Sequence, residues 1–359
     1  LLFHARQFGL RRLRRHKVGA KIPKKGEKAM ITLKDVVELP SGRIFICETT
    51  DEKGDPYIVE CTEMQDVTGK EHPEVLVTDD IELIRANLVP YEEKWLMTVS
   101  TQLGCGYQCR FCDVPLLPFR GNLSAEQIIE QIDLIIRESP HVQKTKKAKI
   151  GFARMGEPAL NWCNVLEAIR YLKNHPWGDF RFLPCYNSIV PDTTIHGASP
   201  FEILEEVLRV KEEIFGGFLH LQLSINSTSE EERHWLFHGA KVVPLVRLVE
   251  FFDQHTVTDR TITLNFICGD GWELDPEKLK GLDPAKFAIK LIPLNKTTRG
   301  DRDGLKAFAN YRNFDLLKQR GDEIRALGLN VVVDTIAKCE EAGLCCGQLA
   351  HIYMDKYKK

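Results

Sequence analysis

The feature that most constrains the fold is an alternation of strand-like and helix-like segments that begins at about residue 96. Apolar residues recur with a period of two in the strand-like runs and with a helical period between them. About six or seven successive strand–helix units favour a parallel sheet, because each parallel strand needs a crossover connection. The predicted fold is therefore α/β, either barrel-like or doubly wound. The strand-like runs are LMTVST (96–101), KAKIGFA (147–153), DFRFLPCY (179–186), FLHLQLSI (218–225), TITLNFI (261–267), FAIKLIPL (287–294) and LNVVVDTI (329–336).

Two of the intervening segments carry clear helix-end signals. The segment SAEQIIEQIDLIIRE (124–138) opens with Ser124 and Gln127 at the spacing of a capping box, which predicts a helix start. The segment LKAFANYRNFDLLKQRGDEIRAL (305–327) precedes Gly328, a residue type that commonly follows a helix end. We expect both segments to be helical.

The N-terminal part of the chain differs from the rest. Residues 1–26 hold nine Lys or Arg and no acid, which leaves −11 on the remainder when the whole chain carries −2. Such an arm is typical of a nucleic-acid contact, an organelle-targeting segment or a solvated helix. Residues 30–90 read as short strands separated by turn signals such as Pro40-Ser41-Gly42. We therefore expect a basic arm (1–29), a small β-rich N-terminal domain (30–92) and a barrel domain (93–359).

Composition narrows the class of protein. Hydrophobic residues make up 43% of the chain and charged residues 28%, as in ordinary globular proteins. No apolar run approaches the roughly 18 residues of a membrane helix, so no membrane partner is expected. Eleven cysteines, an odd number with irregular spacing, argue against a disulfide framework and for a reducing compartment. We expect a cytoplasmic protein.

Three of these cysteines form a compact motif. Cys105, Cys109 and Cys112 lie within the stretch STQLGCGYQCRFCDVP, which directly follows the first strand of the alternating region. Structural zinc requires four ligands, and no nearby Cys or His completes the set. Iron–sulfur clusters take one thiolate per iron, so three thiolates leave one iron open to a substrate. The motif therefore favours an iron–sulfur cluster over zinc.

Polar residues follow several of the other predicted strands. Because the carboxyl ends of parallel strands meet at one end of a barrel, these residues are expected to share a site. Each on its own would also fit a turn or a strand-end cap. They are Gly156, Glu157 and Pro158 in RMGEP, Asn187 and Ser188 after RFLPCY, Ser224 at the end of HLQLS, and Asn295 after KLIPL.

The motif C-x3-C-x2-C with Phe111 before its last cysteine resembles the signature of the radical S-adenosylmethionine superfamily. Within that superfamily, LCCGQLA (344–350) near the C-terminus resembles the RlmN/Cfr family of methyl synthases, which methylate adenine carbons in ribosomal RNA. The similarity is spread over residues 89–352 and includes VPYEEKWLMTVSTQLGCGYQCRFC, FRGNLSAEQIIEQ, RMGEPALN and LIPLN. The resemblance implies a partial (β/α)6-type radical barrel with a small β-rich appendage.

The resemblance also implies the cofactors and their ligands. Cys105, Cys109 and Cys112 would hold a 4Fe–4S cluster, fed by a reductase or flavodoxin-type electron donor. The Gly-Glu-Pro corner, Ser224 and Asn295 would bind S-adenosyl-L-methionine, with Asn187 and Ser188 as further candidates. Cys346 matches the family's methyl carrier, from which a methylene radical adds to the acceptor carbon.

Two departures from the family affect the mechanism and the substrate. The family's second cysteine, which assists release of the product, falls on Thr98, whose hydroxyl neither ionises near neutral pH nor forms a disulfide. Cys345 and Cys339 are the nearest replacements in sequence, and Cys345 is the catalytic candidate. The family's helical RNA-binding domain has no room in the approximately thirty residues before the β-rich segment.

Three functions remain open from the sequence. The favoured one is a methyl synthase acting on a nucleotide, metabolite or peptide, since the body of the protein is acidic and the RNA-binding domain lacks a counterpart. The second is an RNA adenosine methyltransferase, and the third is a non-catalytic iron–sulfur protein. Cys346 argues against the third, because a methyl-carrying thiol has no role in it.

Overall fold

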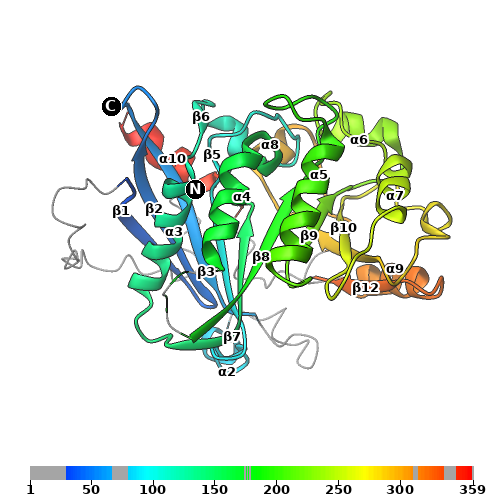
Figure 1. Cartoon of the computed structure of the whole chain (residues 1–359), viewed down its shortest axis with the longest axis horizontal. Helices are drawn as coiled ribbons and strands as arrows, with labels where there is room; N and C mark the ends of the chain where they lie inside the picture. Colours follow the sequence, from blue (N-terminus) through cyan, green and yellow to red (C-terminus); the bar gives the residue numbers. More distant parts are fainter. Residues whose placement is uncertain are drawn as a thin grey trace.

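The computed structural model describes residues 30–66, 80–173, 175, 177, 179–309, 314–334 and 345–357. In this part of the chain, a ten-stranded sheet has the order β1-β2-β3-β4-β7-β8-β9-β10-β11-β12, and β5 pairs with β6 separately (Figure 1). The strands are β1 (Thr32–Leu39), β2 (Gly42–Thr50), β3 (Pro56–Met64), β4 (Trp95–Val99), β5 (Gln102–Leu103), β6 (Gly121–Asn122), β7 (Lys144–Phe152), β8 (Asp179–Ser188), β9 (His220–Ser224), β10 (Ile262–Cys268), β11 (Phe287–Pro293) and β12 (Asn330–Val333).

From β4 to β12 every pairing in the large sheet is parallel, which confirms the predicted α/β fold. Each of the seven strand-like runs of the sequence overlaps one of these strands. Their order in the sheet follows their order in the chain, without the reversal that defines a doubly wound sheet. The strand order therefore selects the barrel-like alternative.

The β-rich N-terminal segment extends the same sheet. Strands β1, β2 and β3 form an antiparallel meander, and Thr62 of β3 lies opposite Thr98 of β4. The boundary predicted between residues 92 and 93 thus falls just before β4, where the meander joins the parallel strands. The basic arm, residues 1–29, lies outside the described residues.

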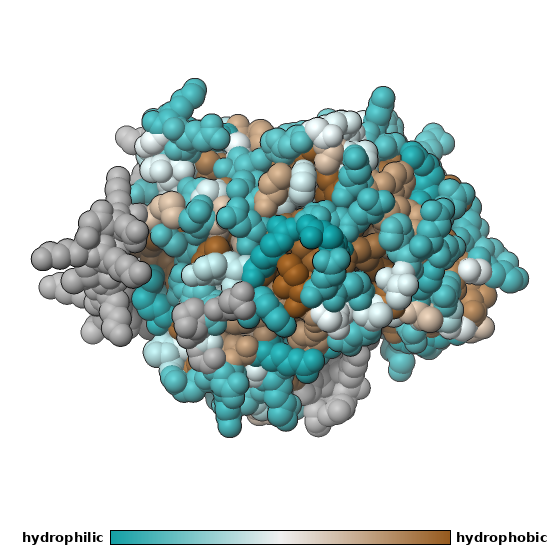
Figure 2. All heavy atoms as spheres, viewed as in Figure 1, coloured by the Kyte–Doolittle hydropathy of each residue, from teal (hydrophilic) through white to brown (hydrophobic). Residues whose placement is uncertain are grey.

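The two faces of the parallel sheet differ in burial. On β11, Phe287, Ile289 and Leu291 are fully buried beneath helices, whereas the intervening Lys290 is partly exposed. Figure 1 shows α3, α4 and α5 in front of the sheet, and Figure 2 shows that their outer surface is largely hydrophilic. The opposite, concave face is the inner wall of the partial barrel. The helices are α2 (Ile81–Ala86), η2 (Val114–Leu116), α3 (Ala125–Glu138), η3 (Pro158–Asn161), α4 (Trp162–Leu172), α5 (Pro200–Arg209), η4 (Val210–Ile214), α6 (Glu230–Leu236), α7 (Leu245–Asp253), η5 (Pro276–Leu279), α8 (Thr298–Arg302), α9 (Phe314–Arg325) and α10 (Gln348–Tyr357).

One of the two predicted helix limits is confirmed and the other is partly wrong. The Ser124 hydroxyl accepts from the Gln127 amide at 3.2 Å, and the Gln127 side chain accepts from the Ser124 amide at 2.9 Å. The helix predicted from residue 305 instead begins at Phe314. Residues 305–309 are not helical. The Phe308 amide donates to the carbonyl of Cys268, the last residue of β10, at 3.1 Å, so the segment packs against the end of that strand.

The C-terminal helix α10 returns to the N-terminal strands. Figure 1 shows it beside β1 and β2, and the Tyr353 hydroxyl bonds to the Asp35 carboxylate of β1. The Ala350 amide donates to the Glu60 carboxylate of β3 at 2.6 Å. The last described helix therefore closes the edge of the barrel that the N-terminal meander forms. Across the described residues, no helix combines the length and the apolar character that crossing a bilayer demands.

Candidate active site

The three-cysteine motif forms a loop between β5 and η2. All three thiols are free and partly exposed, the Cys112 amide donates to the Cys109 carbonyl at 3.3 Å, and the Tyr107 amide donates to Cys105 Sγ at 3.5 Å. Burial raises the pKa of Cys105 to about 12 and also raises those of Cys109 and Cys112, where thiolate repulsion adds to the effect. The thiols must therefore lose protons when they bind a metal.

This donor set fits a cluster better than a single ion. Among the described residues, no three His, Cys, Asp or Glu side chains converge on one metal-ion position. A cuboidal iron–sulfur cluster does not require such convergence, because each thiolate binds a different iron. Cys105, Cys109 and Cys112 are therefore the residues that could hold it.

The Gly-Glu-Pro corner after β7 lies against this loop. Gly156 has φ of +99°, and a Cβ there would lie 2.6 Å from Gln102 Cβ, so only glycine fits. Burial raises the pKa of Glu157 to about 7, although its carboxylate accepts from the amides of Ala159 (3.1 Å) and Ile189 (3.2 Å). Glu157 in turn raises the pKa of Cys109, which shows that the corner faces the cysteines.

The other predicted strand-end residues have different surroundings. The Ser188 hydroxyl bonds to Glu157 and accepts from the Val190 amide at 2.8 Å, so it supports the corner from β8. Ser224 is partly exposed at the end of β9. Asn295, after β11, hydrogen-bonds the Cys345 thiol. Asn187, on β8, donates from Nδ2 to Gln222 Oε1 of the neighbouring strand β9 at 2.9 Å.

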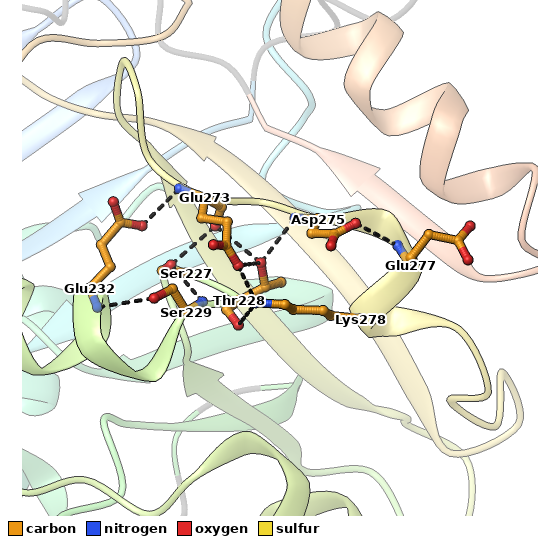
Figure 3. A network of polar contacts seen from close by, with 8 residues as sticks. All are labelled: Ser227, Thr228, Ser229, Glu232, Glu273, Asp275, Glu277 and Lys278. Atoms are coloured by element: carbon orange, nitrogen blue, oxygen red, sulfur yellow. Dashed lines mark hydrogen bonds and ion pairs between the residues drawn. The ribbon is translucent and has the colours of Figure 1, made fainter.

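The loop that follows Ser224, the last residue of β9, is held in place by polar contacts with a second loop. Figure 3 shows Thr228 and Glu273 at the centre of a polar network that joins this loop to the loop after β10. The Thr228 hydroxyl donates to the Glu273 carboxylate at 2.9 Å, and Lys278 Nζ donates to the same carboxylate at 2.6 Å. Because these bonds cross between loops, they limit movement at the ends of both strands.

The segment Cys345–Gln348 brings the predicted methyl carrier to the same place. Cys346 Sγ donates to the Ala153 carbonyl at 3.5 Å, and its charge raises the pKa of Cys112. Burial raises the pKa of Cys346 itself, and the Arg154 guanidinium opposes that rise. The structure therefore places Cys346 beside both the cysteine loop and the strand end of β7.

The Gln348 side chain connects the C-terminal segment to the cysteine loop. Its Nε2 donates to Asp113 Oδ2 at 3.0 Å, and its Oε1 accepts from the Cys345 amide at 3.1 Å. Asp113 directly follows Cys112 and also accepts from the amides of Thr298 (2.8 Å) and Arg299 (2.9 Å). One carboxylate thus ties the cysteine loop, the C-terminal segment and α8 together.

Sequence reasoning missed a buried ion pair that holds this segment. Glu60 on β3 is fully buried, accepts from Arg154 Nε at 2.7 Å and also accepts from the Gly347 amide at 3.2 Å. The sequence feature that could have revealed this ion pair is Glu60 within YIVEC, an otherwise apolar run of β3. Buried carboxylates need partners, so its position could have indicated a site.

Thr98, which replaces the family's second cysteine, lies on the same face of the sheet. Its hydroxyl is 2.6 Å from that of Thr62, its partner across β3 and β4. Glu60 is two residues from Thr62, so both point to the inner wall. Of the suggested replacements, Cys345 donates to the Lys296 carbonyl at 3.9 Å, near β11, and Cys339 lies outside the described residues.

Comparison with known proteins identifies related sequences. No family model matches the chain. A Chlorobaculum tepidum protein named as a probable dual-specificity RNA methyltransferase RlmN is 28% identical over 235 residues, 65% of this chain and 59% of the relative. The protein of the same name from Dictyoglomus turgidum is 25% identical over 287 residues, 78% of this chain and 76% of the relative. This chain therefore spans roughly three-fifths to three-quarters of these relatives' lengths.

A solved structure shares the fold. A radical SAM methyltransferase from Sphaerobacter thermophilus aligns with a TM-score of 0.63 at 18% identity, covering 89% of this chain and 81% of that one. At this identity the likeness concerns the fold alone. The predicted partial barrel with its added N-terminal strands is confirmed.

Proposed function

We propose that this chain is a divergent RlmN-type radical S-adenosylmethionine methyltransferase and that it methylates an adenine carbon in RNA. The named relatives are RNA methyltransferases, which supports RNA over the nucleotide, metabolite or peptide acceptor that the sequence favoured. The family uses a 4Fe–4S cluster and S-adenosylmethionine, and such a cluster supplies the electron that opens the sulfonium. A reductase or flavodoxin-type protein is the proposed electron donor.

The residues of this chain take separate parts in the proposed reaction. Cys105, Cys109 and Cys112 would hold the cluster, since their loop offers three thiols without a fourth ligand. The strand-end residues would orient S-adenosylmethionine, since they surround that loop. These are Gly156, Glu157, Pro158, Ser188, Ser224 and Asn295.

The position of Cys346 is the observation that carries the proposal. Its thiol lies at the end of β7, and its charge acts on Cys112. The Arg154 guanidinium stabilises the thiolate that must accept a methyl group, against the effect of burial. Because the Cys346 thiol lies beside the cysteine loop at the end of β7, we assign Cys346 as the methyl carrier.

The test is mass spectrometry of the protein and of RNA after anaerobic incubation with S-adenosylmethionine, a reductant and total RNA. We expect a methyl or methylene unit on Cys346 and methylated adenine in the RNA. Cys346→Ala should transfer no carbon, and Cys163→Ala, which changes an exposed cysteine of α4, should behave as wild type. Carbon transfer by Cys346→Ala would refute the carrier role, and unmethylated RNA with wild type would refute the RNA acceptor.

A further inference from the structure

Three amide side chains on adjacent strands form a hydrogen-bonded row on the inner wall of the barrel. Gln222 of β9 lies opposite Asn187 of β8, and its Oε1 accepts from Asn187 Nδ2 at 2.9 Å. The same oxygen accepts from Asn265 Nδ2 of β10 at 3.3 Å. Gln222 therefore sets the orientation of both asparagines.

His220 determines which way the Gln222 side-chain amide is oriented. Gln222 Nε2 lies 3.0 Å from His220 Nδ1, and His220 Nε2 lies 2.7 Å from the Thr263 hydroxyl. Burial, with a smaller effect of Lys149 and Lys290, lowers the pKa of His220 to about 3, so the ring is neutral. With the proton of the ring on Nε2, Nδ1 accepts from Gln222 Nε2, and Gln222 Oε1 is directed at the asparagines.

The row leaves two acceptors unused. The Oδ1 atoms of Asn187 and Asn265 are buried, and neither has a hydrogen-bond donor among the described residues. Asn265 as a whole is only 5% exposed. Buried acceptors almost always have a donor, so two on strands β8 and β10, on either side of β9, indicate a ligand that brings N–H or O–H groups.

The charges nearby restrict what that ligand is. Lys290 of β11 is the direct register partner of Asn265, and Lys149 lies on the same inner face. Lys149 disfavours an ammonium or sulfonium donor at this place, whereas the charge of Lys290 is balanced by its ion pair with Asp334 at 2.5 Å. The surroundings therefore favour a neutral donor, such as the amino group of a nucleobase.

The row also lies next to the proposed methyl carrier. The register of β7 and β8 ends with Phe152 opposite Tyr186, and Ala153 and Asn187 are the next residues of the two strands. Ala153 is the residue whose carbonyl accepts from Cys346 Sγ. Neighbouring strands are about 5 Å apart, so a base at Asn187 would lie close to that sulfur.

We propose that Asn187 and Asn265 bind the exocyclic amino group of the acceptor adenine through their two Oδ1 atoms, with Gln222 as the positioning residue. This assignment rests on the proposed RNA methylation and adds the means of base selection. Asn187, predicted from the sequence as a cofactor ligand, is here assigned to the acceptor. An exocyclic amino group has two N–H bonds, one for each of the two unused acceptors.

The test compares RNA substrates that differ in one atom group. The target adenosine of an RNA that wild type methylates is replaced by purine riboside, which lacks the amino group, or by inosine, which carries an oxygen there. Wild type should prefer adenosine by about 10- to 100-fold in kcat/KM, the range expected when a buried acceptor loses its donor. Asn265→Leu should reduce this preference to near one, and Asn265→Asp, which keeps an acceptor oxygen, should retain most of it.

Asn330→Leu is the matched control, because Asn330 is an exposed asparagine of β12 whose side chain donates to the Pro284 carbonyl at 3.1 Å. It should keep the wild-type preference. Equal use of adenosine and purine riboside by wild type would overturn the inference, as would a preference for inosine. An Asn265→Leu variant with unchanged base preference but a raised KM for S-adenosylmethionine would also overturn it. Absence of RNA methylation by wild type would instead refute the proposed function, and the inference with it.

Discussion

Glu60 and Arg154 form a buried ion pair between β3 and the end of β7, with Arg154 NH2 and Glu60 Oε2 2.6 Å apart. The pair matters because Glu60 uses its remaining capacity on the amides of Gly347 and Ala350, which flank the start of α10. The N-terminal meander thus holds the segment that carries Cys346. A carboxylate with these partners links the stability of the fold to the geometry of the site.

Glu60→Gln is expected to reduce the free energy of unfolding by about 3–5 kcal/mol, because it leaves the Arg154 charge buried without its carboxylate. Methyl transfer should fall with it, since the Cys346 segment loses its anchor. Denaturant unfolding and the rate at which Cys346 reacts with a thiol reagent measure the two effects. Glu82→Gln removes the exposed partner of Arg85 and should change stability by less than about 1 kcal/mol. Equal losses in the two variants would contradict the prediction.

Gly347→Ala should displace the Cys346 segment. Gly347 has φ of +81°, and an added Cβ would lie 2.8 Å from Val114 Cα, in backbone that cannot move aside. Gly54→Ala is the control, because Gly54 has φ of +86° with no atom within 4 Å of the added carbon. The control should lose about 1–2 kcal/mol from backbone strain alone, and Gly347→Ala should lose more and also lose methyl transfer. A fully active Gly347→Ala enzyme would show that the contact with Val114 is not needed.

Single Ala substitutions at Cys105, Cys109 and Cys112 should each abolish cluster assembly and cleavage of S-adenosylmethionine, because no fourth ligand replaces a missing thiolate. Iron content after anaerobic reconstitution and release of 5′-deoxyadenosine are the measurements. Cys185→Ala, which alters a buried cysteine on β8, is a control that should keep its iron. Normal iron in all three loop variants would disprove the ligand assignment.

Cys345→Ser should turn over without accumulating a covalent enzyme–RNA adduct. Burial raises the pKa of Cys345 to about 12, and its thiol is directed to the Lys296 carbonyl near β11, whereas Cys346 is directed to β7. Such a thiol is poorly placed and poorly ionised for releasing the product from Cys346. Denaturing gels with labelled RNA reveal the adduct. Its accumulation only in Cys345→Ser would make Cys345 the release group.

Stability should decrease as the pH falls below about 6.5, in part because of His220. Its pKa drops from 6.5 to about 3 on folding, so the unfolded chain binds a proton that the folded chain refuses. Its contribution is complete above pH 6.5 and is lost progressively toward pH 3. His220→Gln should reduce the loss between pH 7 and pH 5 by about 2 kcal/mol, measured by denaturant unfolding. His234→Gln, at an exposed histidine of α6, should leave the pH profile as it is in wild type.

The strands of the parallel region were predictable because strand periodicity is local, whereas their order across the sheet was left with two alternatives. In β11, every second residue faces the helices, and this alternation is written in FAIKLIP itself. The start of α9 was not predictable in the same way. Residues 305–309 have helical composition, but Phe308 pairs with the Cys268 carbonyl, forty residues earlier in the chain. A tertiary contact of this kind overrides local propensity.

The site was predictable only where a motif had a known chemistry. Cysteine spacing predicts the loop proposed to hold the cluster, and strand ends predict Glu157 and Ser224 as candidate cofactor ligands. Glu60 and the row Asn187–Gln222–Asn265 depend on which residues face each other across strands, and register is not visible in a single sequence. The orientation of Gln222 further depends on the protonation of His220, which follows mainly from burial of the ring.

The bond between Glu60 and the Gly347 amide joins residues 287 positions apart. During synthesis, the cysteine loop and the strands of the barrel leave the ribosome long before α10 does. A nascent chain therefore presents the three cysteines proposed to hold iron before Cys346, the proposed carbon-carrying thiol, is in place. Docking of α10 onto β3 would bring that thiol to the site, so the order of translation itself would delay the proposed transfer until α10 has been made.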